Sequence, residues 1–419
     1  MQILIIGKTA KSGILARKIK EYNPEAIIFI APGNQAIEDY ATCVDIQSNN
    51  VEDLVDFALA NEIDITIVCD DEAIESEVVE AFNESGLMIF GQEKESARFA
   101  ISKSVGKRFM YKLKLQTPKF GIFDKENSAR EYLKNSTYPI LIKADKHDFG
   151  ERIHLCLSER EANTILNKLF ATEDPKVVIE NYVSGREFSF YAITDGYNAM
   201  PICAVVPYKY ASEKDGGSIT NGIGAYAPAN FVDEEIINKI INTIIYPVLT
   251  ETEKSASPYI GILGVDLILD ENNELFVIEF NTFINEPDIE CVLEILDEDI
   301  ISLFRACSVG SLADDYEQLK IKDLSSISII LTKTPEYLFD DQQDEIKFCE
   351  EMDENIKINY YNTVNKNNTI KAKNGRVLSL TTSACTLGQA KNNLSNWVDC
   401  ITFKGKKFRK DILDNINER

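Results

Sequence analysis

Short β-branched apolar runs alternate with amphipathic stretches through the first hundred residues. The apolar runs are residues 3–6, 26–30, 65–68 and 87–90, and the amphipathic stretches are 13–21, 51–61 and 72–85. Runs of the first kind are typical of parallel strands buried on both faces, and the second kind predicts crossover helices. Strand and helix at this spacing predict an open parallel α/β sheet. Its ligands would bind beyond the carboxyl ends of the strands, at the loops that begin with Gly7, Ala31, Cys69 and Gly91.

Charge and cysteine content exclude several classes of protein. Forty-four basic and 68 acidic residues give a net charge of −24. Such a field repels phosphate backbones and anionic lipids, so we expect neither nucleic acid nor a membrane surface as a partner. No apolar run approaches the roughly 20 residues that span a bilayer, and residues 1–6 are too short and uncharged for a signal peptide. Nine scattered cysteines without a C-x-x-C pair predict reduced thiols in the cytoplasm, and two histidines disfavour zinc.

The pattern changes after the first hundred residues. A predicted helix over 96–115 leads to Thr117-Pro118, which predicts a boundary because the residue before proline disfavours helix. Strands and hairpin turns then follow from Pro139, interrupted by a predicted helix over 234–250. Strands over 260–269 and 275–280 form a predicted hairpin. After an acidic helix expected over 294–303, the last ninety residues form a smaller α/β unit.

Asp266, Glu279 and Asn281 form the strongest candidate site. The two carboxylates lie on neighbouring strands of the predicted hairpin. Asn281 is two residues beyond Glu279, so both side chains point to the same face. Two carboxylates and an amide oxygen are hard ligands that suit Mg²⁺. A solvated acidic face would give the same pattern in a chain of this charge.

Two lysines and two glutamates accompany this set. Lys143 ends the apolar run 140–142 and Lys103 follows Ile101-Ser102. A lysine that closes a buried strand needs an anion, for which phosphate oxygens would serve, although the side chain could instead extend to solvent. Glu180 could accept from an adenine amino group and Glu187 from ribose hydroxyls. Surface carboxylates would explain either residue equally well.

The segment 215–226 is the most glycine-rich part of a chain that has only 20 glycines. Glycine lets a backbone approach a ligand closely, which predicts a binding loop. A mobile surface loop has the same composition.

These pieces, in this order, resemble the ATP-grasp enzymes and, among them, the phosphoribosylamine–glycine ligase (glycinamide ribonucleotide synthetase) family. The resemblance rests on Ala31-Pro32-Gly33-Asn34, Ser102-Lys103, Lys143-Ala144-Asp145, Gly185-Arg186-Glu187, Gly224-Ala225-Tyr226, Glu279-Phe280-Asn281, Gly375-Arg376-Val377-Leu378 and Phe408-Arg409-Lys410-Asp411.

The resemblance implies a fold and an activity. It implies an N-terminal α/β substrate-binding domain (1–100), a small ATP-grasp lobe with a linker helix (101–190), a large lobe with the metal site (191–322) and a small C-terminal α/β domain (323–419). The implied activity is ATP-dependent joining of a carboxylate to an amine through an acyl phosphate. ATP and Mg²⁺, with Mn²⁺ as an alternative ion, would be the cofactors. An amine and an amino acid would be the small-molecule partners of a monomer or homodimer.

The resemblance also assigns roles by position. Lys103 and Lys143 would hold ATP phosphates, Glu180 and the Tyr182–Val183 backbone the adenine, and Glu187 the ribose. Glu279 and Asn281 match the metal ligands of the family and, with Lys143, would be the catalytic residues. Asp266 matches an extra carboxylate of other ATP-grasp enzymes. Asn34 and Asp215 match positions that contact the phosphoribosyl substrate in the family. Thr220 and Gly222, in the glycine-rich segment, are also expected to bind substrate.

Departures from the family pattern lie on the substrate side. The family motif Gly-Gly-Arg-Glu-His is replaced by Thr9-Ala10-Lys11-Ser12-Gly13, and its Gly-Pro-Glu turn by Cys69-Asp70-Asp71. A flexible loop with a phosphate-gripping lysine becomes 146–152, and Phe283 replaces an arginine. Glycinamide ribonucleotide synthesis is therefore one hypothesis, and a related ligase for a different amine or amino acid is another. A third is a relative that binds nucleotide without catalysis.

Overall fold

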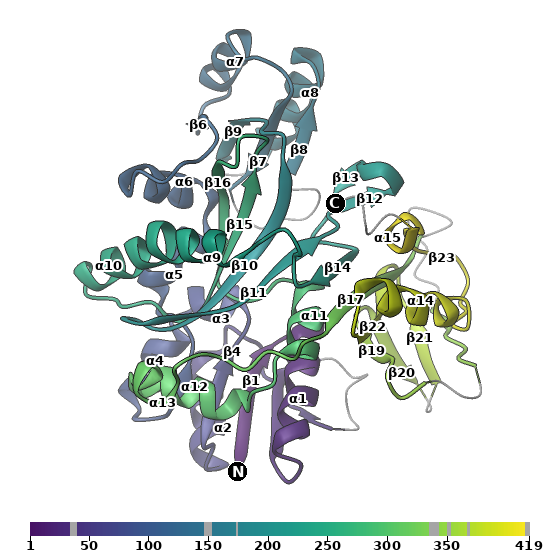
Figure 1. Cartoon of the computed structure of the whole chain (residues 1–419). Coiled ribbons are helices and arrows are strands. Elements are labelled where there is room, and N and C mark those ends of the chain that lie inside the picture. The colour runs from purple at the N-terminus through teal and green to yellow at the C-terminus, as the bar shows by residue number, and fades with distance from the viewer. Residues whose placement is uncertain are drawn as a thin grey trace.

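The computed structural model describes residues 1–33, 40–145, 153–172, 175–334, 343–349, 353–366 and 369–414. Asn34 and the loop 146–152 lie outside these residues. Figure 1 shows a small lobe that projects from the top of the molecule, a broad sheet across the middle, the N-terminal domain below it and the C-terminal domain to one side.

The N-terminal domain is a parallel α/β unit, as the sequence predicts. Its sheet, counted over the described residues, has five strands in the order β3-β2-β1-β4-β5. The elements are β1 (Gln2–Gly7), α1 (Ala10–Tyr22), β2 (Ile27–Pro32), β3 (Thr42–Cys43), α2 (Val51–Ala60), β4 (Ile65–Val68), α3 (Asp71–Glu75), α4 (Val78–Glu84) and β5 (Ile89–Phe90). The single helix predicted over 72–85 is wrong, because Glu77 adopts a left-handed φ of 64° and separates α3 from α4.

The small lobe follows two consecutive helices, α5 (Lys94–Ile101) and α6 (Lys103–Lys112). The one helix predicted over 96–115 is therefore broken at Ser102, whose side chain caps α6 by accepting from the backbone N–H of Val105. In the described part of the lobe, four antiparallel strands run in the order β6-β9-β7-β8. The elements of the lobe are β6 (Phe120–Phe123), α7 (Glu126–Lys134), β7 (Ile140–Ala144), β8 (Ile153–Cys156), α8 (Glu159–Leu169) and β9 (Val177–Asn181).

One long sheet, called here the central sheet, runs from the large lobe into the C-terminal domain. Its strands follow the order β16-β15-β10-β11-β14-β17-β22-β19, and β23 also pairs with β17. The strands are β10 (Arg186–Asp195), β11 (Ala199–Pro207), β14 (Gly224–Ala227), β15 (Ile260–Leu269), β16 (Leu275–Asn281), β17 (Ser325–Lys333), β19 (Lys357–Tyr360), β22 (Gly375–Ala384) and β23 (Lys406–Lys407). Pairing of β14 with β17 makes the sheet continuous across residues 322 and 323.

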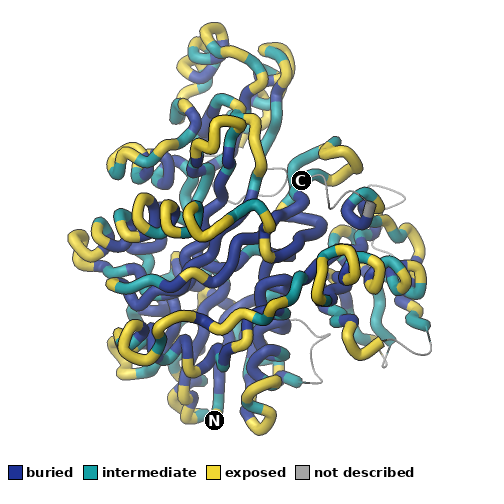
Figure 2. Tube along the Cα trace, viewed as in Figure 1, coloured by how far each residue is buried: buried dark blue, intermediate teal, exposed yellow. Residues whose placement is uncertain are grey.

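Helices cover the central sheet. They are α9 (Glu234–Ile240), a π-helical turn (Ile241–Ile245), α10 (Tyr246–Lys254), α11 (Asp288–Ile295), α12 (Ile300–Val309) and α13 (Leu312–Asp315). The acidic helix predicted over 294–303 is wrong, because α11 ends at Ile295 and Asp299 caps the separate helix α12 by accepting from the N–H of Ile301. The apolar side chains of the strands lie beneath these helices, where Figure 2 shows the chain as buried.

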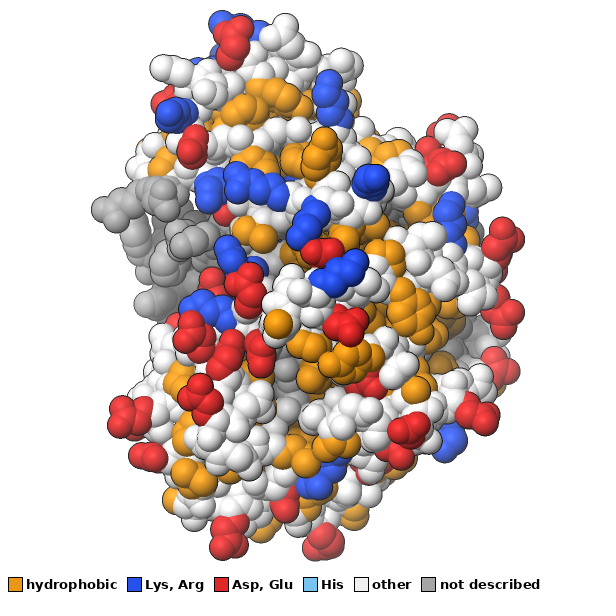
Figure 3. All heavy atoms as spheres, turned by 90° about the vertical axis from the view of Figure 1, so that its left-hand side faces the viewer, with side chains coloured by type: hydrophobic (Ala, Val, Ile, Leu, Met, Phe, Trp, Pro, Cys, Tyr) orange, Lys and Arg blue, Asp and Glu red, His pale blue; other side chains and the backbone are white. Residues whose placement is uncertain are grey.

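The remaining elements include α14 (Leu387–Val398), which packs on β22 and β17 of the central sheet. The others are the hairpin β12 (Tyr210–Ser212) and β13 (Gly216–Ile219), the short strands β18 (Asp344–Glu345), β20 (Thr363–Lys366) and β21 (Thr369–Ala372), and the helix α15 (Asp411–Asp414). Charge is unevenly spread: on the face in Figure 3, basic side chains gather toward the upper half and acidic ones surround the lower half. Within the described ranges, no helix is long and apolar enough to cross a membrane.

Candidate active site

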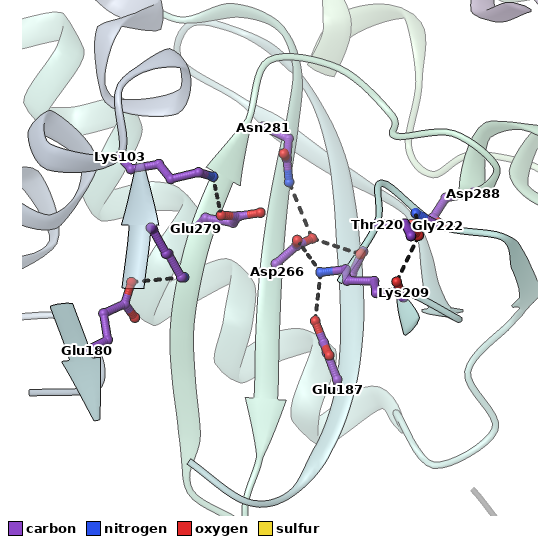
Figure 4. Close-up of polar contacts among 12 residues, drawn as sticks. Lys103, Glu180, Glu187, Lys209, Thr220, Gly222, Asp266, Glu279, Asn281 and Asp288 are labelled. Atoms are coloured by element: carbon purple, nitrogen blue, oxygen red, sulfur yellow. Dashed lines mark hydrogen bonds and ion pairs between the residues drawn. The ribbon is translucent and has the colours of Figure 1, made fainter. Parts of the chain in front are cut away.

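The hairpin of β15 and β16 brings the predicted metal ligands together. Asp266 on β15 pairs in register with Glu279 on β16, and Asn281 pairs with Gly264. A register shift follows Asp266, so the ladder is irregular next to the carboxylates. Figure 4 shows Asp266, Glu279 and Asn281 gathered on one side of this hairpin. The sequence prediction that these three side chains share a face therefore agrees with their placement.

Glu279 is surrounded by positive charge. The Nζ of Lys103, in the first turn of α6, lies 2.7 Å from its Oε2. Burial alone would raise the pKa of Glu279, but Lys103, Lys143 and Lys209 outweigh burial and hold that pKa well below its ordinary value. Glu279 is therefore ionised at neutral pH, as a cation ligand must be.

Asp266 is held by donors of the protein itself. Its Oδ1 accepts from the Ser189 hydroxyl at 2.8 Å and from Asn281 Nδ2 at 3.3 Å, and its Oδ2 lies 2.7 Å from Lys209 Nζ. The carboxylate is buried, and that burial raises its pKa against the opposing effect of Lys209. Asn281 donates through its nitrogen here, which leaves its amide oxygen as the group it can offer a cation.

Lys209 is a site residue that the sequence analysis missed. Its Nζ bridges Asp266 and Glu187 Oε1, each at 2.7 Å (Figure 4). Burial would lower its pKa, but the two carboxylates outweigh burial and raise the pKa well above the ordinary value. Lys209 follows the apolar strand β11 within two residues, so the signal that identified Lys143, a lysine closing a buried strand, was also present here.

Lys143 and Glu180 form a buried ion pair in the small lobe. Lys143 Nζ lies 2.9 Å from Glu180 Oε1, and Lys107 Nζ lies 3.0 Å from Oε2. Glu180 is 1 % exposed, and its two lysines outweigh burial and lower its pKa. Both carboxylate oxygens of Glu180 therefore face lysines.

A cavity of about 460 Å³ opens between the small lobe and the central sheet, and it is called here the interlobe cavity. Its volume is in the range of small-molecule sites. Apolar and polar side chains from both lobes line it, among them Leu141, Lys143, Tyr182, Val183, Glu187, Lys209, Tyr210, Asp215, Ile219, Ile278 and Glu279. A larger groove of about 810 Å³ runs along β8 and β13, but none of the predicted site residues lines it.

The predicted binding residues of the glycine-rich segment 215–226 lie in two different places. Asp215 lines the interlobe cavity, whereas Thr220 and Gly222 form a turn beside it. Thr220 donates through Oγ1 to the carbonyl of Lys209 and accepts from the N–H of Gly222. Gly222 has φ +103°, and a Cβ there would lie 2.7 Å from Pro287, so this turn requires glycine.

The carboxyl edge of the N-terminal sheet faces this region. Asp71 accepts from the hydroxyl of Thr282, and Glu286 accepts from the N–H of Lys11 at 3.0 Å. Arg376 Nη1, from the C-terminal domain, lies 3.6 Å from Glu286. The acidic residues Asp71 and Glu286 and the basic residue Arg376 therefore lie in the region where the sequence analysis expects the substrate.

A buried tyrosine and aspartate lie behind the site. The Tyr191 hydroxyl donates to Asp288 Oδ2 at 2.7 Å and accepts from the N–H of Asn285. Burial raises the pKa of Asp288 to about 7, and the hydrogen bond from Tyr191 only partly offsets it. This pair joins β10 to the start of α11.

Family models and curated relatives that match this chain all point to the same protein family. Residues 1–100 match the family model "Phosphoribosylglycinamide synthetase, N domain", and residues 101–291 match "Phosphoribosylglycinamide synthetase, ATP-grasp (A) domain". Phosphoribosylamine–glycine ligases from Caldanaerobacter subterraneus and Pasteurella multocida are 30 % and 31 % identical, over 98 % of this chain and 99 % and 97 % of theirs.

Solved structures agree on the fold. Phosphoribosylamine–glycine ligase from Thermotoga maritima superposes with a TM-score of 0.82 at 23 % identity, covering 98 % of this chain and all of that one. Biotin carboxylase from Campylobacter jejuni, solved as a beta-gamma-ATP complex, gives a TM-score of 0.73 at 18 % identity, covering 98 % of this chain and 94 % of that one.

Proposed function

Because this chain belongs to the phosphoribosylamine–glycine ligase family of ATP-grasp ligases, we propose that it joins glycine to phosphoribosylamine, using ATP, to form glycinamide ribonucleotide, ADP and phosphate. This reaction is a step of purine biosynthesis. The observation that carries the proposal is the convergence of Lys143, Lys209 and Glu279 on one cavity between two lobes.

In the proposed reaction the γ-phosphoryl group of ATP moves to a carboxylate oxygen of glycine and ADP leaves. The amine of phosphoribosylamine then attacks the carbonyl carbon of the acyl phosphate, and phosphate and a proton are released. No residue of the protein forms a covalent bond with substrate. The residues therefore act by positioning the reactants and stabilising the phosphate charge.

Two lysines would supply that stabilisation. Lys103 and Lys143 would bind phosphate oxygens, and each lies against a carboxylate that it would share with the ligand. Glu279 and Asn281 would hold Mg²⁺, with Asp266 across the hairpin, because their oxygens are hard ligands and Glu279 is ionised. Bound there, Mg²⁺ would neutralise phosphate charge. Among the described residues no three His, Cys, Asp or Glu side chains gather as a metal site, so amide, water and phosphate oxygens would complete the coordination.

The nucleoside would bind on the small-lobe side of the interlobe cavity. The backbone at Tyr182 and Val183 would contact adenine, and Glu187 would contact the ribose hydroxyls. Glu180 instead fixes Lys143 and Lys107 through two ion pairs. We place the reaction in the cytoplasm, with small molecules as the only partners of a monomer or homodimer.

The test supplies purified protein with ATP, Mg²⁺, glycine and phosphoribosylamine generated in situ, and measures ADP and product mass. Substrate-dependent ADP release together with glycinamide ribonucleotide supports the proposal. Folded protein that is stabilised against heat by ATP and Mg²⁺ but forms no glycinamide ribonucleotide contradicts it.

A second candidate is a related ligase that uses a different amine. It is favoured by the carboxylates of Asp70 and Asp71 at the carboxyl end of β4, which would repel a sugar phosphate. An assay of ADP release in which uncharged and cationic amines replace phosphoribosylamine distinguishes the two candidate functions. Only an enzyme of the second kind releases ADP with one of these amines when phosphoribosylamine is absent.

A further inference from the structure

The hairpin β12–β13 forms one wall of the interlobe cavity, yet little of its own structure holds it there. Tyr210, Asp215 and Ile219 line the cavity. Within the described residues, β12 and β13 pair only with each other, and their tip is exposed. Lys214 and Asp215 have φ of 58° and 53°, a left-handed backbone that is unfavourable for residues other than glycine. The conformation therefore needs support from outside the hairpin.

Arg409, almost two hundred residues further along the chain, supplies that support. Its Nη1 donates to the carbonyl of Tyr210 and to Asp215 Oδ1, both at 3.1 Å. The guanidinium also lies over the ring of Tyr208, 5.4 Å from its centroid. Arg409 is only 2 % exposed, so its guanidinium is largely shielded from water although Asp215 is partly exposed.

Asp411 completes the contact from the opposite edge of the guanidinium. It accepts from Arg409 Nε at 2.8 Å and from Nη2 at 2.5 Å, in a bidentate pair. Its Oδ2 also accepts from the backbone N–H of Lys214 at 3.0 Å. One carboxylate thus fixes both the orientation of Arg409 and the left-handed residue at the tip of the hairpin.

The segment that carries these two residues is itself fixed to the central sheet. Ile412 is fully buried, and a Cβ at Gly224 would lie 2.7 Å from its Cδ1, so α15 packs directly on β14. Just before it, β23 pairs with β17. The segment 408–413 is therefore a rigid base for the hairpin.

We propose that Arg409 and Asp411 are positioning residues that hold the β12–β13 hairpin in place as a wall of the interlobe cavity, so that the C-terminal segment determines the affinity for the ATP that this cavity would bind. The ATP-binding part rests on the proposed function, whereas the position of the hairpin does not. Arg409 does not touch the reacting atoms and acts through Tyr210 and Asp215.

The test compares Arg409→Lys and Asp411→Asn with Arg98→Lys, a control at an exposed arginine that pairs with Glu95 on α5. Arg409→Lys keeps the charge but loses the planar fork. We expect the KM for ATP to rise roughly tenfold in both variants, with kcat changed less than threefold, in line with the loss of a charge-assisted hydrogen bond. The control should match wild type.

A second readout needs no catalysis. Lys214 is exposed, so trypsin can cut after it once the hairpin moves. Trypsin digestion is carried out under native conditions, and mass spectrometry monitors cleavage at Lys214. We expect this cleavage to be at least several times faster in both variants than in wild type and in Arg98→Lys.

The two readouts separate the possible failures. Absence of ligase activity in every protein, with faster cleavage in the two variants, contradicts the proposed function and supports the positioning role. Wild-type cleavage and wild-type KM for ATP in folded variants overturn the positioning role. If Arg409→Lys fails to fold, Asp411→Asn decides, because its side chain is 14 % exposed.

Discussion

Lys103 and Lys209 approach the β15–β16 hairpin from different elements, and each neutralises one carboxylate. Asp266 and Glu279 are paired in register on adjacent strands, an arrangement in which like charges repel. Lys209 lies 2.7 Å from Asp266 and Lys103 lies 2.7 Å from Glu279. A cation or phosphate that enters the site must therefore exchange partners with these lysines. The charges of the site are balanced before any ligand arrives.

Removing the Glu279 charge tests this balance. Glu279→Gln keeps the shape of the side chain but leaves Lys103 without its ion partner and Mg²⁺ without a carboxylate. We expect ADP formation to fall by roughly a hundredfold or more, measured at saturating ATP and Mg²⁺. Glu271→Gln, the same change at the exposed turn of the same hairpin, is the control. Turnover like wild type in Glu279→Gln would refute the site assignment.

Asp288 predicts a pH dependence of stability. Its pKa rises from an ordinary 3.8 to about 7 in the folded protein, so the folded state binds a proton that the unfolded state has lost between these values. The contribution of Asp288 to stability is therefore full below about pH 4 and is lost as pH rises through 7. Asp288→Asn removes this dependence.

Melting temperatures of Asp288→Asn and wild type, measured from pH 4 to pH 8, provide the check. The difference between the two proteins should shift in favour of the variant as pH rises. A difference that stays constant across this range would mean that Asp288 is ionised throughout.

At the scale of elements, the break between α5 and α6 positions Lys103. Ser102 ends α5 and caps α6, and its hydroxyl also donates to Asp145. Asp145 accepts from the N–H of Ser104 as well. A continuous helix would direct the first turn of α6 elsewhere, so the broken helix is part of the site.

Gly106 makes this close approach of α5 and α6 possible. A Cβ there would lie 2.6 Å from the carbonyl oxygen of Phe99. We expect Gly106→Ala to lower the melting temperature by several degrees and to reduce activity, because the helices must separate. Gly388→Ala in α14, where a Cβ meets nothing within 4 Å, should be neutral or stabilising. Calorimetry of the two variants checks this, and equal melting temperatures would contradict it.

The spacing of apolar residues along the chain gave most of the correct predictions of the fold. Short apolar runs and alternation identified the parallel sheet and the β15–β16 hairpin, and the hairpin in turn placed Asp266, Glu279 and Asn281 together. At two of the helix breaks a local signal was present, because Ser102 and Asp299 are residues that favour N-caps. The break at Glu77 has no such signal, because its left-handed φ is not typical of glutamate. Lys209 closes a buried strand as Lys143 does, but its carboxylate partners come from other strands, so its place in the site was not predicted. The sequence also gives no sign that Arg409 reaches Tyr210 and Asp215, almost two hundred residues away.

At the scale of the whole molecule, two separate sheets enclose the interlobe cavity. The small lobe has its own sheet and its own apolar core, whereas the central sheet is shared by the large lobe and the C-terminal domain. Few covalent connections join the two, and lobes of this kind close over their ligands. We therefore expect the small lobe to move toward the central sheet when nucleotide binds.

Hydrogen exchange tests this closure. With ATP and Mg²⁺ we expect slower exchange in β7, β9 and the hairpin β12–β13, and unchanged exchange in β1 and β4 of the N-terminal sheet. Equal protection of all these segments would indicate general stabilisation instead of lobe closure.

Pairing of β14 with β17 also limits how such a chain can be divided. A chain that stopped at residue 322 would lose β17, and β14 would become an open edge whose free N–H and C=O groups attract strands of other copies. It would also lose the segment 408–413 that supports the hairpin at the cavity. A chain truncated in this way would therefore expose both an unpaired strand edge and a hairpin without its support.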